Sequence, residues 1–231
     1  MRRLLVHVEG QTEYDFVNDL LRPHLTAFGY ASIYPSLMGN ARHTNQGGGV
    51  RSWTSARREI VDHLHEDRAR LVTTMVDFYA MPTSWPGRSK VTGISSEHKA
   101  RQVEQAMHAD IAKHPRWQSG AGRFRPFVIM HEFEALLFSD TACFAATSRQ
   151  PGIEPALRAI LTKYASPEDI NEKPETIPSQ RIVGLIPNYG KHTDGPKAAA
   201  AIGLPTIRAA CPHFNAWLTD LETWPTRLAQ S

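Results

Sequence analysis

The hydrophobic positions of the first 140 residues follow two patterns in turn. Short apolar runs of strand length lie at residues 3–9, 31–38, 71–77 and 124–130. Between these runs, apolar side chains recur every three or four residues, which is the spacing of one helix face. Strands that alternate with helices form a mostly parallel sheet with right-handed crossovers. We therefore predict a Rossmann-like α/β fold with a four-stranded, mostly parallel sheet flanked by helices.

Prolines refine this prediction at two places. Pro35 falls inside the second predicted strand, and proline is tolerated there mainly at a sheet edge. Pro23 lies in the helix that follows the first strand, and we expect it to kink or end that helix. The next two predicted helices span residues 52–67 and 96–113.

The character of the chain changes after about residue 139, because no further run of strand type appears. Short helical patterns follow at residues 154–164, from 167 onward, and at 178–186, 196–202 and 213–223. Two of them begin at Pro167 and Pro178, which suit a first helical position. We predict an α/β core over residues 1–140 and an all-helical extension over residues 141–231 that packs on the core.

Composition and charge exclude some classes of protein. The 231 residues are 41% hydrophobic and 21% charged, which excludes a disordered chain. The net charge of +3 permits binding to nucleic acid without arguing for it. Cys143 and Cys211 fit neither a zinc spacing nor a disulfide framework, so a reducing compartment is expected. The chain shows neither a signal-peptide pattern nor a membrane-spanning apolar run, so we expect a soluble cytoplasmic protein without membrane contact.

Acidic residues follow three of the predicted strands. Glu9 ends the first strand, Asp77 ends the third, and Glu132 and Glu134 follow the fourth, while Glu13 lies one helical turn after Glu9. In a doubly wound sheet the first and third strands are neighbours, and ligands bind at the carboxyl edge beside them. Clustered carboxylates repel one another unless a cation is present, and such hard oxygens suit Mg²⁺ or Mn²⁺. These five carboxylates are therefore the predicted metal ligands.

Structural explanations compete with this prediction for individual acids. Glu9 could accept backbone amides where the helix starts, and the helix dipole alone explains Glu13. Residues two apart on a helix point in different directions, so only one of Glu132 and Glu134 should face the site. We favour Glu132 for the metal and expect Glu134 to bond to a neighbour or to the segment around Arg181.

Basic residues provide candidate contacts to phosphate. These candidates are Arg42, Arg51, Arg88, Lys90, Arg181, Lys191 and Lys197. Most surface lysines and arginines are only solvated. Arg181 and Lys191 are the stronger candidates, because they lie in a polar stretch of an otherwise helical tail. A catalytic role is predicted for these two residues together with Glu9, Asp77 and Glu132.

Several segments of the chain resemble one family. They are Val6–Glu13, Met75–Tyr79 with Trp85–Gly87, Met130–Phe138, Pro178–Ile182 and Cys211–Phe214. Together they resemble the bacterial Toprim-like family catalogued as domain of unknown function 4276. More distantly, Glu9 and Asp77 resemble the acids of the Toprim domain in topoisomerases, primases and overcoming-lysogenization-defect nucleases. Where that domain has a second aspartate after its third strand, this chain has Tyr79, a poor Mg²⁺ ligand at neutral pH.

The resemblance implies a Mg²⁺- or Mn²⁺-dependent enzyme that acts on DNA or RNA. Several relatives of this type are nucleases that act with an ATPase in antiviral defence, and the resemblance implies the same role here. We therefore expect a metal-dependent endonuclease with nucleic acid and an AAA- or ABC-type ATPase as partners, assembled as a homodimer. The alternative is a non-catalytic binding or regulatory subunit of an ATPase complex with a degenerate Toprim site. Nucleotidyl transfer, as in Toprim primases, is a third hypothesis.

Overall fold

The structure is a computed structural model that describes residues 1–38, 52–92, 95–116, 121–171 and 176–227. Two of the predicted phosphate contacts, Arg42 and Arg51, lie outside these described residues.

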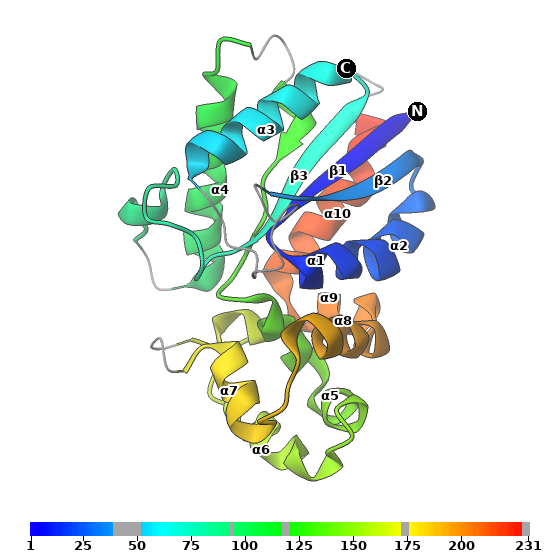
Figure 1. Cartoon of the computed structure of the whole chain (residues 1–231), viewed down its shortest axis with the longest axis vertical. Coiled ribbons are helices and arrows are strands. Elements are labelled where there is room, and N and C mark those ends of the chain that lie inside the picture. The colour runs from blue at the N-terminus through cyan, green and yellow to red at the C-terminus, as the bar shows by residue number, and fades with distance from the viewer. Residues whose placement is uncertain (39–51, 93–94, 117–120, 172–175, 228–231) are drawn as a thin grey trace.

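A parallel sheet forms the centre of the upper part of the molecule in Figure 1. Its strands are β1 (Arg2–Val8), β2 (Tyr30–Leu37), β3 (Arg70–Asp77), β4 (Phe124–Arg125) and β5 (Val128–Ile129). The order is β2-β1-β3-β4, and β5 also pairs with β3. The neighbouring positions of β1 and β3 and the edge position of β2 are therefore confirmed.

The fourth predicted strand is wrong in one respect, because it forms two short strands instead of one. Pro126 lies between β4 and β5 and has no amide hydrogen to donate to the sheet. At this point the side chain of Thr74 replaces the backbone bonds of the sheet. Its Oγ1 donates to the carbonyl of Phe127 and accepts from the amide of Phe127, both at 2.9 Å. The strand direction is thus kept across the break, and β5 leads to the turn that carries the last two acids.

The chain after β1 remains helical through Pro23. It forms α1 (Gln11–Phe16), a π-helical segment (Val17–Leu21) and α2 (Arg22–Thr26). The amide of Arg22 bonds to the carbonyl of Val17, five residues back, so the wider π turn comes directly before the proline. Of the two outcomes expected at Pro23, a kink or an end of the helix, the helix does not end there, because a π turn directly before the proline accommodates it.

Helices cover both faces of the sheet (Figure 1). Alternate residues of β1 face opposite sides: Leu4 and Val6 pack with α1 and α10 (Pro212–Arg227), whereas Leu5 packs with α3 (Trp53–Glu66) and α4 (Ser96–Ala112). Since α10 is the last helix, the end of the chain returns to the sheet. Trp217 in α10 donates from Nε1 to Thr73 Oγ1 in β3 at 2.9 Å.

The segment after β5 is helical, as predicted, but its elements differ in detail. It contains the 3₁₀ helix η5 (Phe133–Asp140), α5 (Thr141–Thr147), α6 (Glu154–Leu161), α7 (Pro178–Leu185), α8 (Lys191–Ile202) and α9 (Leu204–Ala210). The pattern predicted from residue 167 onward is a single 3₁₀ turn, η7 (Pro167–Asp169). Three further 3₁₀ turns span Arg88–Lys90, Ala121–Arg123 and Pro151–Ile153.

The start of α8 matters most for the site. The helix begins at Lys191 and not at the predicted Pro196, because the side chain of Asp194 accepts the amide of Gly190 at 2.8 Å and fixes an earlier start. Within the described part of the chain, no helix is long and apolar enough to cross a bilayer.

Candidate functional site

The end of β1 brings two acids to the carboxyl edge of the sheet. Gly10 turns the chain from strand to helix, and its amide donates to Glu13 Oε2 at 2.9 Å. Glu13 is buried, with 2% of its surface exposed. Glu13 thus has a structural role that the helix-dipole explanation did not include, since it reaches back to the residue before the helix as in a capping box.

Asp77 lies beside Glu9 at the end of the neighbouring strand. The amide of Asp77 donates to Glu9 Oε2 at 3.2 Å, which joins the two strand ends. Asp77 is only 3% exposed, and its buried Oδ1 has no hydrogen-bond partner among the described residues. A buried oxygen without a partner is costly, so it indicates a position kept for something other than stability.

The turn after β5 separates Glu132 from Glu134. His131 has a left-handed backbone (φ 67°) and Glu132 an extended one (φ −151°), so Glu132 precedes the helix instead of lying on it. Glu132 Oε2 accepts the amide of Ser179 at 2.9 Å, at the start of α7. Glu134 has no exposed surface, and its Oε1 has no partner among the described residues. Of the two partners expected for Glu134, the segment around Arg181 is contacted by Glu132 instead, while Glu134 contacts Lys191.

Lys191 lies among these acids. Its Nζ is 3.0 Å from Glu134 Oε2 and 3.7 Å from Asp77 Oδ2, and 35% of its side chain is exposed. It also interacts electrostatically with Glu9, Glu13 and Glu132. We call these six residues the acid cluster: Glu9, Glu13, Asp77, Glu132, Glu134 and Lys191. The five carboxylates thus lie around one lysine from the tail, and their role as metal ligands stays a prediction.

Burial changes the protonation of the acid cluster. Burial raises the pKa of Glu9 to about 7, with the charge of Glu13 as a second cause, and it also raises the pKa of Glu134 to about 7. Burial likewise raises the pKa of Asp77 well above its usual range. For Lys191, burial would lower the pKa, but the charges of Asp77 and Glu134 raise it above its ordinary value. The ammonium therefore stays charged while the carboxyls around it compete for protons near neutral pH.

The donor types of the acid cluster suit a hard divalent cation, but their present positions do not. In the described part of the chain, no group of three or more His, Cys, Asp or Glu side chains is arranged to hold a metal ion. The ammonium of Lys191 lies where Asp77 and Glu134 would share a cation. A metal could therefore bind to Asp77 and Glu134 only after the ammonium of Lys191 had moved away from them.

A scan against models of protein families gives a match over most of the chain. The model of a domain of unknown function (DUF4276) matches residues 8–222. The chain belongs to this family. The match includes all six residues of the acid cluster. Neither a curated protein nor a solved structure matches the chain.

The start of α8 explains how this DUF4276 chain places Lys191. Thr12 in α1 contacts it: Oγ1 is 3.4 Å from the carbonyl of Lys191 and 3.1 Å from His192 Nδ1. A β-carbon at Gly195 would lie only 3.1 Å from the Tyr189 hydroxyl and 3.4 Å from a methyl carbon of Thr12, so glycine allows α8 to approach α1 closely. The contact joins residues about 180 positions apart, which no local sequence pattern could show.

Tyr189 is a site residue that the sequence did not indicate. Its hydroxyl is buried and has no hydrogen-bond partner among the described residues. Burial raises the pKa of Tyr189, with the charge of Glu134 as a second cause. Tyr189 thus remains a neutral phenol beside the acid cluster.

Among the described residues, the other predicted cations do not contact the acid cluster. Arg181 donates to the carbonyl of Thr176 at 2.6 Å and to the Tyr164 hydroxyl at 2.8 Å, so it stabilises the tail. The Arg88 guanidinium lies 3.9 Å from the centre of the Phe78 ring. Lys90 and Lys197 are exposed. Of the predicted cations in the described segments, Lys191 alone contacts the acid cluster.

Tyr79 follows the end of β3 and lies at the edge of the site. Its amide donates to the carbonyl of His131 at 3.0 Å, and its side chain lies partly in solvent, with 39% of the residue exposed.

Trp53, Trp85 and Trp217 are all buried, so in this structure they serve packing and are not available to stack on bases.

Proposed function

We propose that the acid cluster is the active site of a Mg²⁺- or Mn²⁺-dependent nuclease that hydrolyses phosphodiester bonds. The observation that supports this most is the meeting of acids from three strand ends. Two of these acids, Asp77 and Glu134, each keep a buried oxygen that has no hydrogen-bond partner among the described residues. A structural ion pair would satisfy those oxygens. An incomplete set of hard oxygen donors is what a divalent cation requires.

The residues of the acid cluster have different proposed roles, which follow from their positions. Glu9, Asp77 and Glu134 offer oxygens at the carboxyl edge, while Glu132 and Glu13 are held by backbone amides of neighbouring elements. A bound divalent cation would polarise the phosphate and lower the pKa of an attacking water. Lys191, once displaced from Asp77 and Glu134, would place its ammonium against the negative charge that develops on the phosphate.

Nucleic acid is the proposed substrate, and an AAA- or ABC-type ATPase in antiviral defence is the proposed partner. The similarity of the Glu9 and Asp77 segments to Toprim nucleases supports both parts. The sequence carries no Walker motif, so any coupled ATP hydrolysis would come from that partner.

Cleavage assays test this proposal. Plasmid DNA and structured RNA are incubated with the purified protein in Mg²⁺, in Mn²⁺ and in EDTA. The expected result is cleavage that requires the metal and falls at least 100-fold in Asp77→Ala, with an unchanged circular dichroism spectrum. Arg158→Ala, a change at an exposed pair with Glu154, should cleave like the wild type. Cleavage by Asp77→Ala at the wild-type rate would contradict the proposal.

The second candidate function is a non-catalytic subunit of an ATPase complex. Two observations favour it: the described acids include no group of three arranged for a metal, and Tyr79 replaces a carboxylate. This alternative predicts no heat of metal binding in calorimetry and co-purification with an ATPase. Metal binding together with cleavage would exclude it.

A further inference from the structure

A polar cavity lies next to the turn after β5, the turn that also carries Glu132 of the acid cluster. It has a volume of about 450 Å³ and is formed by the start of α4, His131, and the segments that follow α6 and η7. This size is within the usual range for small-molecule sites. None of the six residues of the acid cluster lines it.

His131 separates the two sites. Its left-handed backbone (φ 67°) is unusual for histidine and turns its side chain toward the cavity, while Glu132 bonds to Ser179. The ring is 8% exposed and contacts Ser96 Oγ through Nε2 at 3.4 Å and Asn171 Nδ2 through Nδ1 at 3.0 Å. The other polar atom of the amide, Asn171 Oδ1, is buried and has no partner among the described residues.

The charges that line the cavity are mainly positive. Lys99 and Lys163 both line it, and neither has an ion pair with another residue that the structure describes. The one acid in the lining, Asp169, already accepts a hydrogen bond from Ser166 Oγ at 3.0 Å. The positive end of the 17-residue helix α4 adds to this field at Ser95 and Ser96.

An aromatic ring completes the lining. Tyr164 is held in place by Arg181, which donates to its hydroxyl at 2.8 Å and lies 5.7 Å from the ring centre. This combination is typical of nucleotide-binding sites, in which a base stacks on the aromatic ring and the phosphate contacts the cationic groups.

We propose that this cavity binds the phosphate of a nucleotide, with Lys99 and Lys163 on the phosphate and Tyr164 beside the base. The nucleotide is either a free mononucleotide or one unit of a nucleic acid strand. The inference stands apart from the proposed nuclease, because it requires neither a metal nor the acid cluster.

Binding measurements in EDTA test the inference. Inorganic phosphate, AMP and a single-stranded 12-nucleotide DNA are titrated into the wild type and into Lys99→Ala/Lys163→Ala. The control is Lys113→Ala/Arg68→Ala, which removes the same charge from two exposed positions away from the cavity, one of them beyond the other end of α4. The expected result is saturable binding of AMP or of the DNA that weakens at least tenfold in the first variant and less than twofold in the control.

Two further variants define the ligand and separate this site from the acid cluster. Tyr164→Leu should weaken the binding of AMP and leave the binding of inorganic phosphate unchanged, while Asp77→Ala should leave the binding of inorganic phosphate and of AMP in EDTA unchanged. Binding of AMP but not DNA assigns a free nucleotide, and binding of DNA with little AMP assigns a strand. The inference would be overturned if the wild type bound none of the three probes saturably. It would also be overturned if Lys99→Ala/Lys163→Ala and the control Lys113→Ala/Arg68→Ala weakened binding equally.

Discussion

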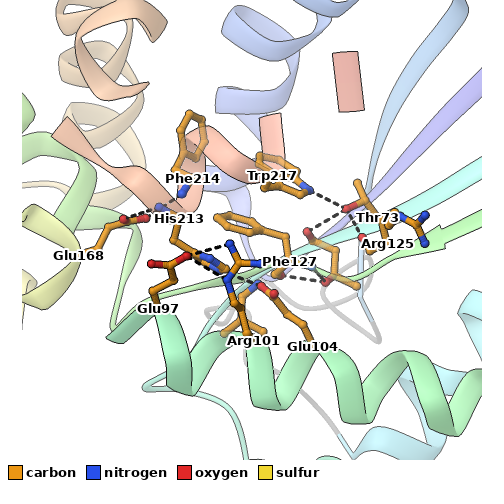
Figure 2. A network of polar contacts seen from close by, with 12 residues as sticks. Thr73, Glu97, Arg101, Glu104, Arg125, Phe127, Glu168, His213, Phe214 and Trp217 are labelled. Atoms are coloured by element: carbon orange, nitrogen blue, oxygen red, sulfur yellow. Dashed lines mark hydrogen bonds and ion pairs between the residues drawn. The ribbon is translucent and has the colours of Figure 1, made fainter. Parts of the chain in front are cut away.

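The carboxylates of two buried charged networks in this protein are bonded in opposite ways. The first is the acid cluster. The second, which we call the α10 anchor, consists of Glu104, Glu168 and His213 (Figure 2). In the α10 anchor both oxygens of Glu168 accept backbone amides at 2.9 Å, from His213 and Phe214, and Glu104 Oε1 accepts from Val128 and contacts His213 Nε2, also at 2.9 Å.

The difference shows which network serves stability. Glu168 caps the start of α10 and Glu104 joins α4 to β5, so these bonds fasten the last helix to the sheet. In the described part of the chain, Asp77 Oδ1 and Glu134 Oε1 of the acid cluster have no hydrogen-bond partner, and five carboxyls lie around one ammonium. Satisfied buried carboxylates stabilise a fold, whereas unsatisfied ones cost free energy and are kept for function.

The largest expected effect on stability is at Glu168. Glu168→Ala removes the acceptor of two buried amides, and each unsatisfied amide costs roughly 1–3 kcal/mol. We expect the free energy of unfolding to fall by about 3 kcal/mol in urea denaturation. Glu97→Ala is the control, because the Glu97 pair with Arg101 is exposed, and it should change stability by less than about 0.5 kcal/mol. Equal stability of the two variants would show that Glu168 does not anchor α10.

The next effect is at Lys191. Lys191→Met removes the cation that the acid cluster shares, and about 2 kcal/mol of stability should be lost. This is less than the roughly 3–5 kcal/mol of a fully buried pair, because 35% of the side chain is exposed. The double variant Lys191→Met/Glu134→Gln should regain much of the loss, as should millimolar Mg²⁺. A loss that neither change reduces would mean that Lys191 acts through packing alone.

A smaller effect of opposite sign is expected at Asp77. Asp77→Asn removes a buried charge with an unpartnered oxygen, so stability should stay the same or rise by about 1 kcal/mol. The same variant should lose metal-dependent cleavage. Thermal unfolding of both proteins in EDTA measures the first part. A loss of several kcal/mol would instead place Asp77 among the structural acids.

The smallest effect is a pH dependence in the α10 anchor. Burial alone would lower the pKa of His213, but the hydrogen bond and charge of Glu104 outweigh it, with Glu168 adding to them, and the pKa is raised. A raised pKa means that the contribution of His213 is complete below about pH 6.5, its unfolded value, and is lost as the pH rises through the folded value. The stability difference between the wild type and His213→Gln should therefore shrink from pH 6 to pH 8. A difference that grows with pH would contradict this sign.

The sequence predicted the parts of the fold that depend on local pattern. Apolar runs separated by helical periods indicated the parallel sheet, and the edge position of β2 followed from Pro35. Because β1 and β3 are neighbours, the approach of Glu9 to Asp77 could also be predicted. These features depend on rules for strand order that hold for most sheets of this type.

The rest of the site depends on tertiary contacts and backbone conformation. The roles of Glu132 and Glu134 depend on the left-handed backbone of His131, which a histidine rarely adopts. The position of Lys191 depends on the contact of α8 with Thr12, about 180 residues away in the sequence. The early start of α8 depends on the bond from the Gly190 amide to Asp194. The sequence pattern did not indicate this start, because it placed Pro196 as the first residue of the helix.

The central claim is that the acid cluster is an incomplete cation site in which Lys191 takes the place of a metal. Calorimetric titration of Mn²⁺ into the wild type, Asp77→Asn and Lys191→Met tests it most directly. We predict saturable binding by the wild type, no binding by Asp77→Asn, and at least tenfold tighter binding by Lys191→Met, because the competing ammonium is gone. No heat with either the wild type or Lys191→Met would contradict the claim, as would unchanged binding in Asp77→Asn.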